Sequence, residues 1–194
     1  MFGVDKKEHN LMSRFKFLLE ALKNFRQVGT VTRSGKALSE KITSFISKED
    51  INILELGAGD GAITKKILER MSPNGKLLAF EINPNMFANL SKIEDSRFFP
   101  INDSAENMEK YMTEHNIDIF DSVVSAIPYI VLPEQLAQKI LGLCKKNLKK
   151  GKNYMQVHYA KTLTDLYEGV FGNVETHFIM FNVPPAYAFR CINE

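Results

Sequence analysis

The stretch Glu55-Leu-Gly-Ala-Gly-Asp-Gly61 decides the fold. Ahead of it lies INILEL, residues 51–56, a mostly apolar segment typical of a buried strand, and after it comes the helical segment ITKKILERM. Glycines allow a tight turn and a close approach of a ligand to the backbone. The helix that follows offers free N–H groups to a negative group. The stretch therefore predicts a ligand-binding strand–turn–helix unit, with a tight turn that binds nothing as the alternative.

Strand-like and helix-like segments alternate through the rest of the chain. We predict further strands at 76–81, 97–101, 119–125 and 153–160, and helices at about 34–46, 63–71, 83–90, 104–112 and 134–150. Two last strand candidates, 174–182 and 186–191, predict an antiparallel pair at one edge. This alternation indicates an α/β, Rossmann-like fold, a seven-stranded and mostly parallel sheet with helices on both faces. Ligands bind such sheets at the carboxyl ends of the strands.

The composition is that of one ordinary globular domain. The 194 residues are 44% hydrophobic and 25% charged, without a low-complexity tract or an internal repeat. Cys144 and Cys191 stand far apart without CxxC spacing, which fits a reducing compartment. The N-terminus lacks the apolar stretch of a signal peptide, and no apolar run approaches the length that crosses a bilayer. We therefore expect a cytoplasmic protein.

Acidic residues follow the second and third predicted strands. Glu81 lies twenty-four residues beyond Gly57, where a carboxylate can accept hydrogen bonds from both ribose hydroxyls, or it is simply a turn acid near a helix start. Asp103 either accepts a hydrogen bond from an adenine amine or caps the next helix. A glycine turn with a ribose acid predicts a nucleoside-containing cofactor, and NAD and S-adenosylmethionine both remain open.

The fourth strand ends in Ser125-Ala-Ile-Pro-Tyr129. A dehydrogenase has no particular role for such a turn at this position. In a methyltransferase, by contrast, this edge is where the acceptor nitrogen must meet the methyl group. The turn therefore favours the methyl-transfer interpretation.

Four motifs resemble successive motifs of class I S-adenosylmethionine-dependent methyltransferases: ELGAGDG at 55–61, FEINP at 80–84, NDSA at 102–105 and SAIPY at 125–129. More narrowly, the chain is similar to the small soluble bacterial phosphatidylethanolamine N-methyltransferases. It shares with them VGTV at 28–31, Gln156 and Tyr159 on strand five, and NVPPA at 182–186. It departs from them at Arg33-Ser34-Gly35, where Pro-Ser-Ser is usual, and in SAIP, where SGLP is common. Both departures touch the acceptor side.

The resemblance implies S-adenosylmethionine as the cofactor, no metal, and a set of contacts. Gly57, Ala58 and Gly59 would surround the methionyl end, in the loop that Gly61 completes. Glu81 would hold the ribose, and Ile82 would pack on the adenine. Asp103 and Ser104 would bind the adenine edge, with Ser125 beside the cofactor. Glu55 would support the loop, with the cofactor's amine as one route of contact.

The implied reaction is in-line attack of a neutral amine on the sulfonium methyl, which the enzyme aligns and shields from water. An ethanolamine headgroup arrives as an ammonium, so a base or a water route must remove a proton. Tyr129, Tyr159 and His158 are the candidate bases, and strand alternation puts His158 and Tyr159 on opposite faces. We expect Tyr129 and Tyr159, with Ser125, to surround the cationic headgroup, and core packing is the alternative for either tyrosine.

The expected acceptor is a phospholipid headgroup, such as phosphatidylethanolamine, at an anionic membrane surface. One alternative is an RNA adenine N6-dimethyltransferase-like enzyme, whose N-[LI]-P-Y motif partly matches SAIPY, although Ser125 replaces the Asn. A small-molecule amine methyltransferase and a non-catalytic cofactor-binding protein are the others. The number of methyl groups and the oligomeric state stay open.

Residues 1–50 carry ten Lys/Arg against six Asp/Glu, and within them 11–26 have an apolar stripe of helical period. This pattern favours shallow insertion into an anionic membrane, hence peripheral contact with the inner membrane face. The alternative is a lid that packs on the sheet over the cofactor. We thus expect a single domain, with 1–48 as a helical cap or membrane-contacting segment and 49–194 as the cofactor-binding core.

Overall fold

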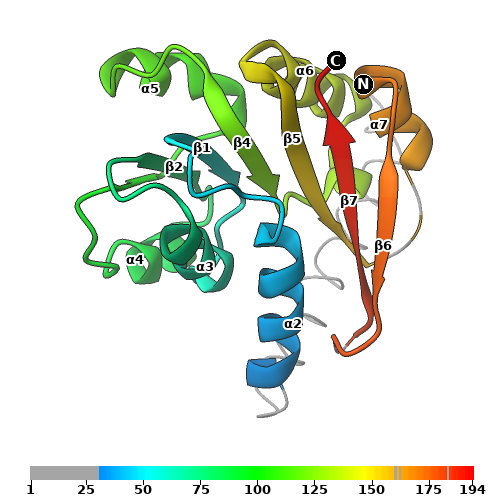
Figure 1. The fold of residues 1–194 in the computed structure, drawn as a ribbon, viewed down its shortest axis with the longest axis horizontal. Coiled ribbons are helices and arrows are strands. Elements are labelled where there is room, and N and C mark those ends of the chain that lie inside the picture. The colour runs from blue at the N-terminus through cyan, green and yellow to red at the C-terminus, as the bar shows by residue number, and fades with distance from the viewer. Residues whose placement is uncertain (1–30, 160, 162, 183) are drawn as a thin grey trace, which may run out of the picture.

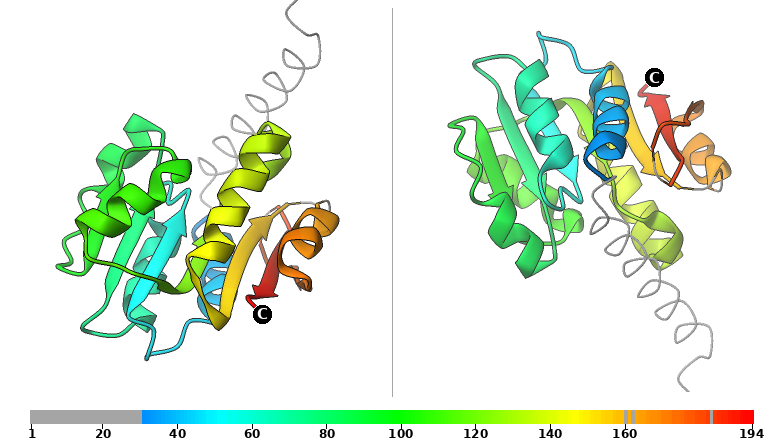
Figure 2. Two further views of the ribbon diagram at one scale, coloured as in Figure 1. Left: turned by 90° about the horizontal axis from the view of Figure 1, so that it is seen from above. Right: turned by 90° about the horizontal axis from the view of Figure 1, so that it is seen from below.

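The computed structural model describes residues 31–159, 161, 163–182 and 184–194. They form one seven-stranded sheet in the order β3-β2-β1-β4-β5-β7-β6 (Figure 1). The strands are β1 (Asn52–Leu56), β2 (Lys76–Phe80), β3 (Phe98–Ile101), β4 (Phe120–Ser125), β5 (Leu148–His158), β6 (Glu175–Ile179) and β7 (Ala186–Ile192). Helices cover both faces of this sheet, and the predicted Rossmann-like architecture is confirmed (Figure 2).

The pairing directions set the place of the ligand crevice. Strands β1 to β5 pair in parallel, whereas β7 runs antiparallel to both of its neighbours, β5 and β6. The predicted antiparallel pair at one edge is therefore confirmed. The strand order reverses at β1, which lies between β2 and β4, with Leu56 opposite Ser125. Sheets with such a switch point bind ligands outside the carboxyl ends of the two strands that flank it, here β1 and β4.

The helices are α2 (Val31–Thr43), α3 (Ala62–Arg70), α4 (Pro84–Leu90), α5 (Met108–Glu114), α6 (Glu134–Lys146) and α7 (Thr164–Phe171), with 3-10 turns η1 (Ala105–Asn107) and η2 (Tyr129–Val131). Strand β1 is buried on both faces, as its apolar residues Ile53, Leu54 and Leu56 predict. Leu54 and Leu56 belong to the core cluster under α5, α6 and α7. Ile53 belongs to the cluster under α2 and α3. By alternation, Glu55 faces the α3 side.

The predictions for residues 134–173 need two corrections. The helix predicted to run to residue 150 ends at Lys146, and 148–150 belong to β5, because Leu148 pairs with Phe120. Gly151 lies in β5 with φ +74°, near a register shift between β4 and β5. No element was predicted over 161–173, where α7 forms and packs against α6.

The second predicted helix, at about 34–46, is present as α2 and begins three residues earlier. Its Leu38 and Ile42 are buried in the cluster that also holds Ile67 of α3. The helix predicted over 11–26 lies outside the described residues. No helix within the described ranges has the length and apolar character needed to cross a bilayer.

Candidate functional site

The glycine turn is bonded to the end of β2. The N–H groups of Gly57 and Ala58 both donate to the Phe80 carbonyl, at 2.8 and 3.1 Å. Gly57 and Gly59 have φ angles of +74° and +60°, which L side chains adopt only with strain. The turn therefore holds a left-handed backbone for which glycine is suited, at the carboxyl end of β1 and bonded to the end of β2.

The three glycines of the turn differ in what surrounds them. A Cβ on Gly57 would lie 3.2 Å from the Ile127 nitrogen, so this residue lets the turn pack against the chain after β4. A Cβ on Gly61 would lie 2.7 Å from a methyl group of Ile93, so this glycine serves packing. A Cβ on Gly59 would meet nothing within 4 Å. Only Gly59 thus borders open space that a ligand can enter.

Glu81, which follows β2, links the end of β2 to the glycine turn after β1. It is only 7% exposed, and its Oε2 accepts from the Gly59 N–H at 2.8 Å while Oε1 accepts from the Asn83 N–H at 2.7 Å. The Asn102 side chain donates to the Glu81 carbonyl at 2.7 Å. An ionised carboxylate has about four acceptor positions. Two remain for hydroxyl donors, which fits the ribose contact predicted from the sequence.

Glu55 is buried beneath the turn with one oxygen unsatisfied. Its Oε2 accepts from the Thr64 hydroxyl at 2.7 Å, whereas its buried Oε1 has no hydrogen-bond partner among the described residues. Burial raises the pKa of Glu55 to about 8, and the charges of Glu81 and Asp60 act in the same direction. A cationic amine beside Oε1 would supply the missing donor. The methionyl amine of S-adenosylmethionine fits this requirement.

Asp103 makes local contacts at the start of η1. Its Oδ1 accepts from the Ser104 N–H at 2.7 Å and from Asn107 Nδ2 at 2.9 Å, and its Oδ2 accepts from the Tyr111 hydroxyl at 2.9 Å. These hydrogen bonds lower the pKa of Asp103, so it is ionised at neutral pH. The N-cap of η1 is Ser104 and not Asp103, so the capping alternative is wrong as stated. An adenine contact of Asp103 or Ser104 stays a prediction, for which Oδ2 keeps one acceptor position.

Ile82 follows β2 directly and is 72% exposed. Because the Ile82 side chain is this exposed and directly follows Glu81, a flat apolar ligand can pack against it. Ala58, in contrast, is buried and can offer a ligand little beyond its backbone. The predicted cofactor residues thus gather at the ends of β1, β2 and β3.

The SAIPY turn is held by β1 and β5. The Ala126 N–H donates to the Leu56 carbonyl at 2.8 Å. The buried Ser125 hydroxyl accepts from the Ile127 N–H at 3.4 Å. Gln156 of β5, also buried, donates through Nε2 to the Ile127 carbonyl at 2.9 Å. Backbone groups of this turn are therefore placed beside the glycine loop by contacts with both neighbouring strands.

Tyr129 lies under the turn with its side chain 2% exposed. The hydroxyl oxygens of Tyr129 and Tyr154 lie 3.3 Å apart, and Tyr167 packs edge-on against Tyr129 with 6.1 Å between the ring centroids. Burial raises the pKa of Tyr129 far above its usual range. The Tyr129 phenol is therefore protonated at neutral pH and can donate a hydrogen bond, but it is not a general base.

His158 and Tyr159 differ as strand alternation predicts. His158 is buried at the end of β5, with its Nε2 2.6 Å from the Tyr167 hydroxyl, and burial lowers its pKa to about 4. It is therefore neutral at pH 7. Tyr159 lies one residue beyond β5 and is 39% exposed, so its predicted place within the strand is wrong by one residue.

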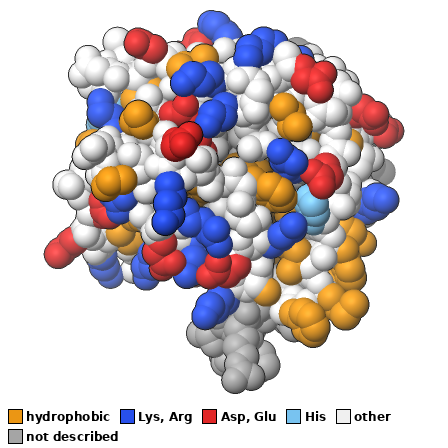
Figure 3. All heavy atoms as spheres, in the orientation of Figure 1, with side chains coloured by type: hydrophobic (Ala, Val, Ile, Leu, Met, Phe, Trp, Pro, Cys, Tyr) orange, Lys and Arg blue, Asp and Glu red, His pale blue; other side chains and the backbone are white. Residues whose placement is uncertain are grey.

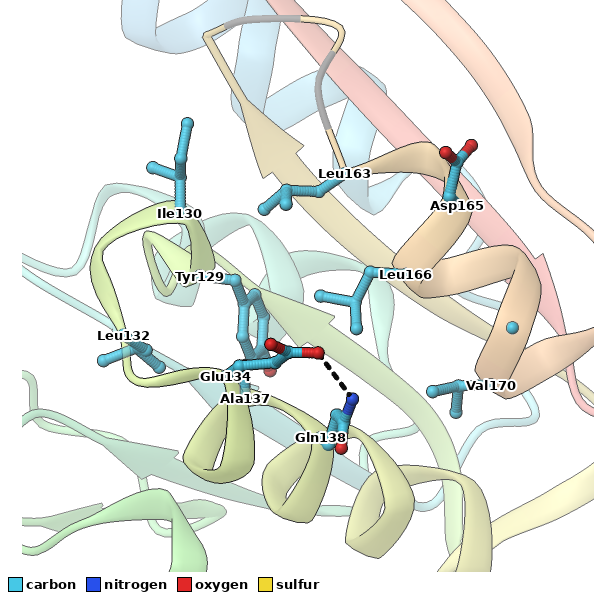
Figure 4. Close-up of a pocket in the computed structure, with 11 residues that line it drawn as sticks. Tyr129, Ile130, Leu132, Glu134, Ala137, Gln138, Leu163, Asp165, Leu166 and Val170 are labelled. Atoms are coloured by element: carbon cyan, nitrogen blue, oxygen red, sulfur yellow. Dashed lines mark hydrogen bonds between the residues drawn. The ribbon is translucent and has the colours of Figure 1, made fainter.

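An open groove runs beside the turn, with a volume of about 770 Å³. Figure 4 shows Leu163 and Leu166 pointing from the start of α7 toward Tyr129 and Ile130. The lining is mostly apolar, with Glu134, Gln138 and Asp165 as its polar members. Glu134 accepts a hydrogen bond from Gln138 at 3.1 Å on the α6 side. Tyr129 lines this groove, so the groove adjoins the SAIPY turn.

Several of these residues were missed from the sequence. Thr64, Tyr154 and Tyr167 gave no signal, because each acts through a partner that only folding brings near. Asn83 had one: an Asn before Pro84 at a helix start is a typical N-cap, and its side chain caps α4. In the described part of the chain, no group of three or more His, Cys, Asp or Glu side chains is arranged to hold a metal.

Comparison with known proteins agrees with this geometry. A family model described as a methyltransferase domain matches residues 47–178. The ornithine lipid N-methyltransferase of Singulisphaera acidiphila is 26% identical over 182 residues, covering 91% of this chain and 94% of that protein. The ribosomal RNA small subunit methyltransferase H of Christiangramia forsetii is 32% identical over 87 residues, covering 45% of this chain and 28% of that protein.

Among solved structures, Aeropyrum pernix fibrillarin with bound S-adenosyl-L-methionine has a TM-score of 0.55 and 21% identity, covering 74% of this chain and 67% of that one. The chain thus shares its fold with a protein that was crystallised with bound S-adenosyl-L-methionine. The family match spans the glycine turn, Glu81 and the SAIPY turn. The chain therefore belongs to the methyltransferase-domain family and is a class I methyltransferase that uses S-adenosylmethionine as its methyl donor.

Proposed function

We propose that the protein transfers a methyl group to the amine of an aminolipid headgroup, such as that of an ornithine lipid or phosphatidylethanolamine. The observation that carries this proposal is the nearly end-to-end similarity to an ornithine lipid N-methyltransferase, over 91% of this chain and 94% of that protein. A shared catalytic core alone would leave the flanking segments unmatched, as it does for the ribosomal RNA relative.

The cofactor would lie across the ends of β1 and β2. Glu55 would accept from its amine, the Gly59 backbone would face its methionyl end, and Glu81 would accept from its ribose. Ile82, exposed in the protein alone, would cover the adenine. The bound cofactor supplies an electrophilic methyl group on a cationic sulfur. The protein's part is to orient this group toward the SAIPY turn and to exclude water.

The acceptor amine would lie against the backbone of the SAIPY turn, whose position Gln156 holds. Tyr129 and Tyr167 stay protonated because burial raises their pKa values, and His158 is a weak base because burial lowers its pKa. None of these three groups is therefore a free base strong enough at neutral pH to deprotonate an aliphatic ammonium. The headgroup instead loses its proton to water, and the neutral amine attacks.

The apolar groove beside Tyr129 supports a lipid acceptor. A hydrocarbon chain can lie along Leu163 and Leu166 while its headgroup reaches the turn. An RNA adenine is less well supported. Ser125 offers no amide carbonyl to the adenine amine, and its hydroxyl already contacts the Ile127 N–H.

The test uses radiolabelled S-adenosylmethionine with vesicles that contain phosphatidylethanolamine or ornithine lipid, and with ribosomal RNA in a parallel reaction. We expect label in the organic phase, and its loss in Glu81→Ala. Glu69→Gln is the matched control, since Glu69 lies exposed on α3 and pairs with Lys66. Label found only in RNA, or in neither substrate, would contradict the proposal.

A further inference from the structure

Exposed hydrophobic side chains of the described residues concentrate at one edge of the sheet. The large ones are Ile51, Ile82, Ile130, Tyr159, Phe178, Met180 and Phe181. All except Ile51 lie at or beyond the carboxyl end of a strand, whereas Ile51 precedes β1 at the opposite edge. This carboxyl edge is also where the glycine turn, Glu81 and the SAIPY turn lie. The apolar surface and the active site therefore share one side of the molecule.

The most exposed part is the tip of the β6–β7 hairpin. Phe178, Met180 and Phe181 have exposed fractions of 54%, 65% and 83%. Figure 3 shows this end of the molecule, at its lower right, as a broad hydrophobic surface. From 178 to 189 the chain contains no charged residue. A contiguous apolar surface of this kind marks an interaction site.

The tip holds its polar groups internally. The Asn182 N–H donates to the Ile179 carbonyl at 3.4 Å, and the Asn182 side chain donates to the Pro184 carbonyl at 2.6 Å. Asn182 is itself buried, as are Ile179 and Ala186 at the ends of the two strands. The hairpin is thus already built with its apolar side chains pointing outward. The two hydrogen bonds of Asn182 lower the cost of moving these polar groups into an apolar phase.

We propose that the β6–β7 hairpin tip inserts into the surface of a lipid bilayer and so brings the carboxyl edge of the sheet against the headgroups. The inference rests on the proposed lipid function, since a headgroup that stays in its membrane must be met by the edge that holds the methyl group. Two aromatic rings and a methionine, in a stretch from 178 to 189 that contains no charged residue, suit the interfacial region, where burying a charge is costly. Exposed Lys161, three residues beyond β5, adds attraction to anionic lipid.

The chain contains no tryptophan, which allows a direct test. Phe181→Trp places a single fluorophore at the tip, and Ile51→Trp is the matched control at the opposite edge, where Ile51 is 49% exposed. Both proteins are titrated with anionic vesicles that contain brominated phospholipid. We expect a blue shift and quenching for the tip tryptophan and neither for the control. No quenching at the tip, or equal quenching at both positions, would overturn the inference.

A second variant removes the apolar side chains without touching the active site. Phe178→Ser combined with Phe181→Ser should weaken partitioning to vesicles by about tenfold or more, since two exposed rings lose their apolar burial. Ile51→Ser should leave partitioning unchanged, and all variants should bind S-adenosylmethionine as the wild type does. Equal partitioning of the double variant and the wild type would contradict the inference. So would a blue shift of the tip tryptophan that depends on protein concentration without vesicles, because the tip would then be a protein interface.

The two proposals fail separately. If the tip tryptophan is quenched while no lipid receives label, the methyl-transfer proposal fails and the membrane contact stands. If lipid in detergent micelles receives label while the tip tryptophan is never quenched by vesicles, the membrane contact fails and the lipid function stands.

Discussion

The side-chain amide of Gln156 donates to the carbonyl oxygen of Ile127 at 2.9 Å, so β5 holds the turn that follows β4. The same amide donates to the Val157 carbonyl, and its oxygen accepts from the Tyr154 hydroxyl. Gln156 thus fixes the position of the SAIPY turn, although it is not itself one of the predicted cofactor residues. Gln156 is a positioning residue.

Gln156→Leu should therefore lower kcat for the acceptor while the affinity for S-adenosylmethionine changes little. Unpaired buried partners should also cost about 2 kcal/mol of stability. Calorimetric cofactor titration and chemical unfolding check these two effects. Gln135→Leu, an exposed position on α6, is the control. A loss of cofactor affinity as large as the loss of kcat would argue against a positioning role.

Cofactor binding should release a proton near neutral pH. Glu55 has a pKa of about 8 when buried without a partner for Oε1, so at pH 7 it is mostly protonated. A cationic amine beside it favours the carboxylate. The affinity should then rise by about tenfold per pH unit below pH 8. Calorimetry in buffers of different ionisation enthalpy measures the proton, and Glu55→Gln should abolish its release. A pH-independent affinity would contradict this assignment.

His158 should weaken the fold at acid pH. Burial lowers its pKa to about 4 in the folded protein from the ordinary histidine value of 6.5, so between these values the unfolded chain binds more protons. Stability therefore falls as pH falls from 6.5 to 4, by up to about 1.4 kcal/mol per pH unit from this residue. His158→Gln should flatten the curve in that window. Glu55 acts with the opposite sign between 4.5 and 8, so the difference between wild type and variant is the quantity to measure.

Gly57→Ala and Gly59→Ala should have different consequences. At Gly57 the new methyl group approaches backbone at 3.2 Å in addition to the left-handed strain, so stability should fall by about 2 kcal/mol. At Gly59 only the strain applies, about 1 kcal/mol, but the methyl enters the predicted cofactor space and affinity should fall. Gly172→Ala, with φ +82° and open space, measures the strain alone. Unchanged cofactor affinity in Gly59→Ala would show that the cofactor does not bind against Gly59.

Filling the groove should discriminate between acceptors. Gly169 lines it, and a Cβ at this position would meet nothing within 4 Å, so Gly169→Leu should fit while occupying the groove. KM should rise severalfold for a long-chain aminolipid and stay constant for a short-chain analogue. Gly142→Leu on α6 is the control, because it is equally open and does not line the groove. An equal effect of both variants, or on both acceptors, would exclude the groove as a chain site.

Local patterns in the sequence were enough for most of the sheet. Ile53, Leu54 and Leu56 predicted β1, and Val123 with Val124 predicted β4, because apolar side chains on successive residues suit a parallel strand that is buried on both faces. The glycines at 57–61 predicted the turn between β1 and α3. The boundary at Lys146 was misplaced because the helical period continues past it. There the pairing of Leu148 with Phe120 overrides local propensity. Helix α7 was missed since its eight residues, TDLYEGVF, include a glycine and offer little more than two helical turns.

The sequence by itself determined the order of the strands and of every described helix except α7, the glycine turn and the acid after β2, because each depends on neighbours within a few residues. Only the tertiary structure decided that Glu55 faces Thr64 with one oxygen unsatisfied, that Tyr129 is sealed beneath Tyr154 and Tyr167, and that Gln156 reaches the SAIPY turn. It also decided that Phe178, Met180 and Phe181 at the tip of the β6–β7 hairpin remain exposed to solvent. Burial, pKa and hydrogen-bond partners depend on segments that are distant in the chain, and folding alone brings those segments together.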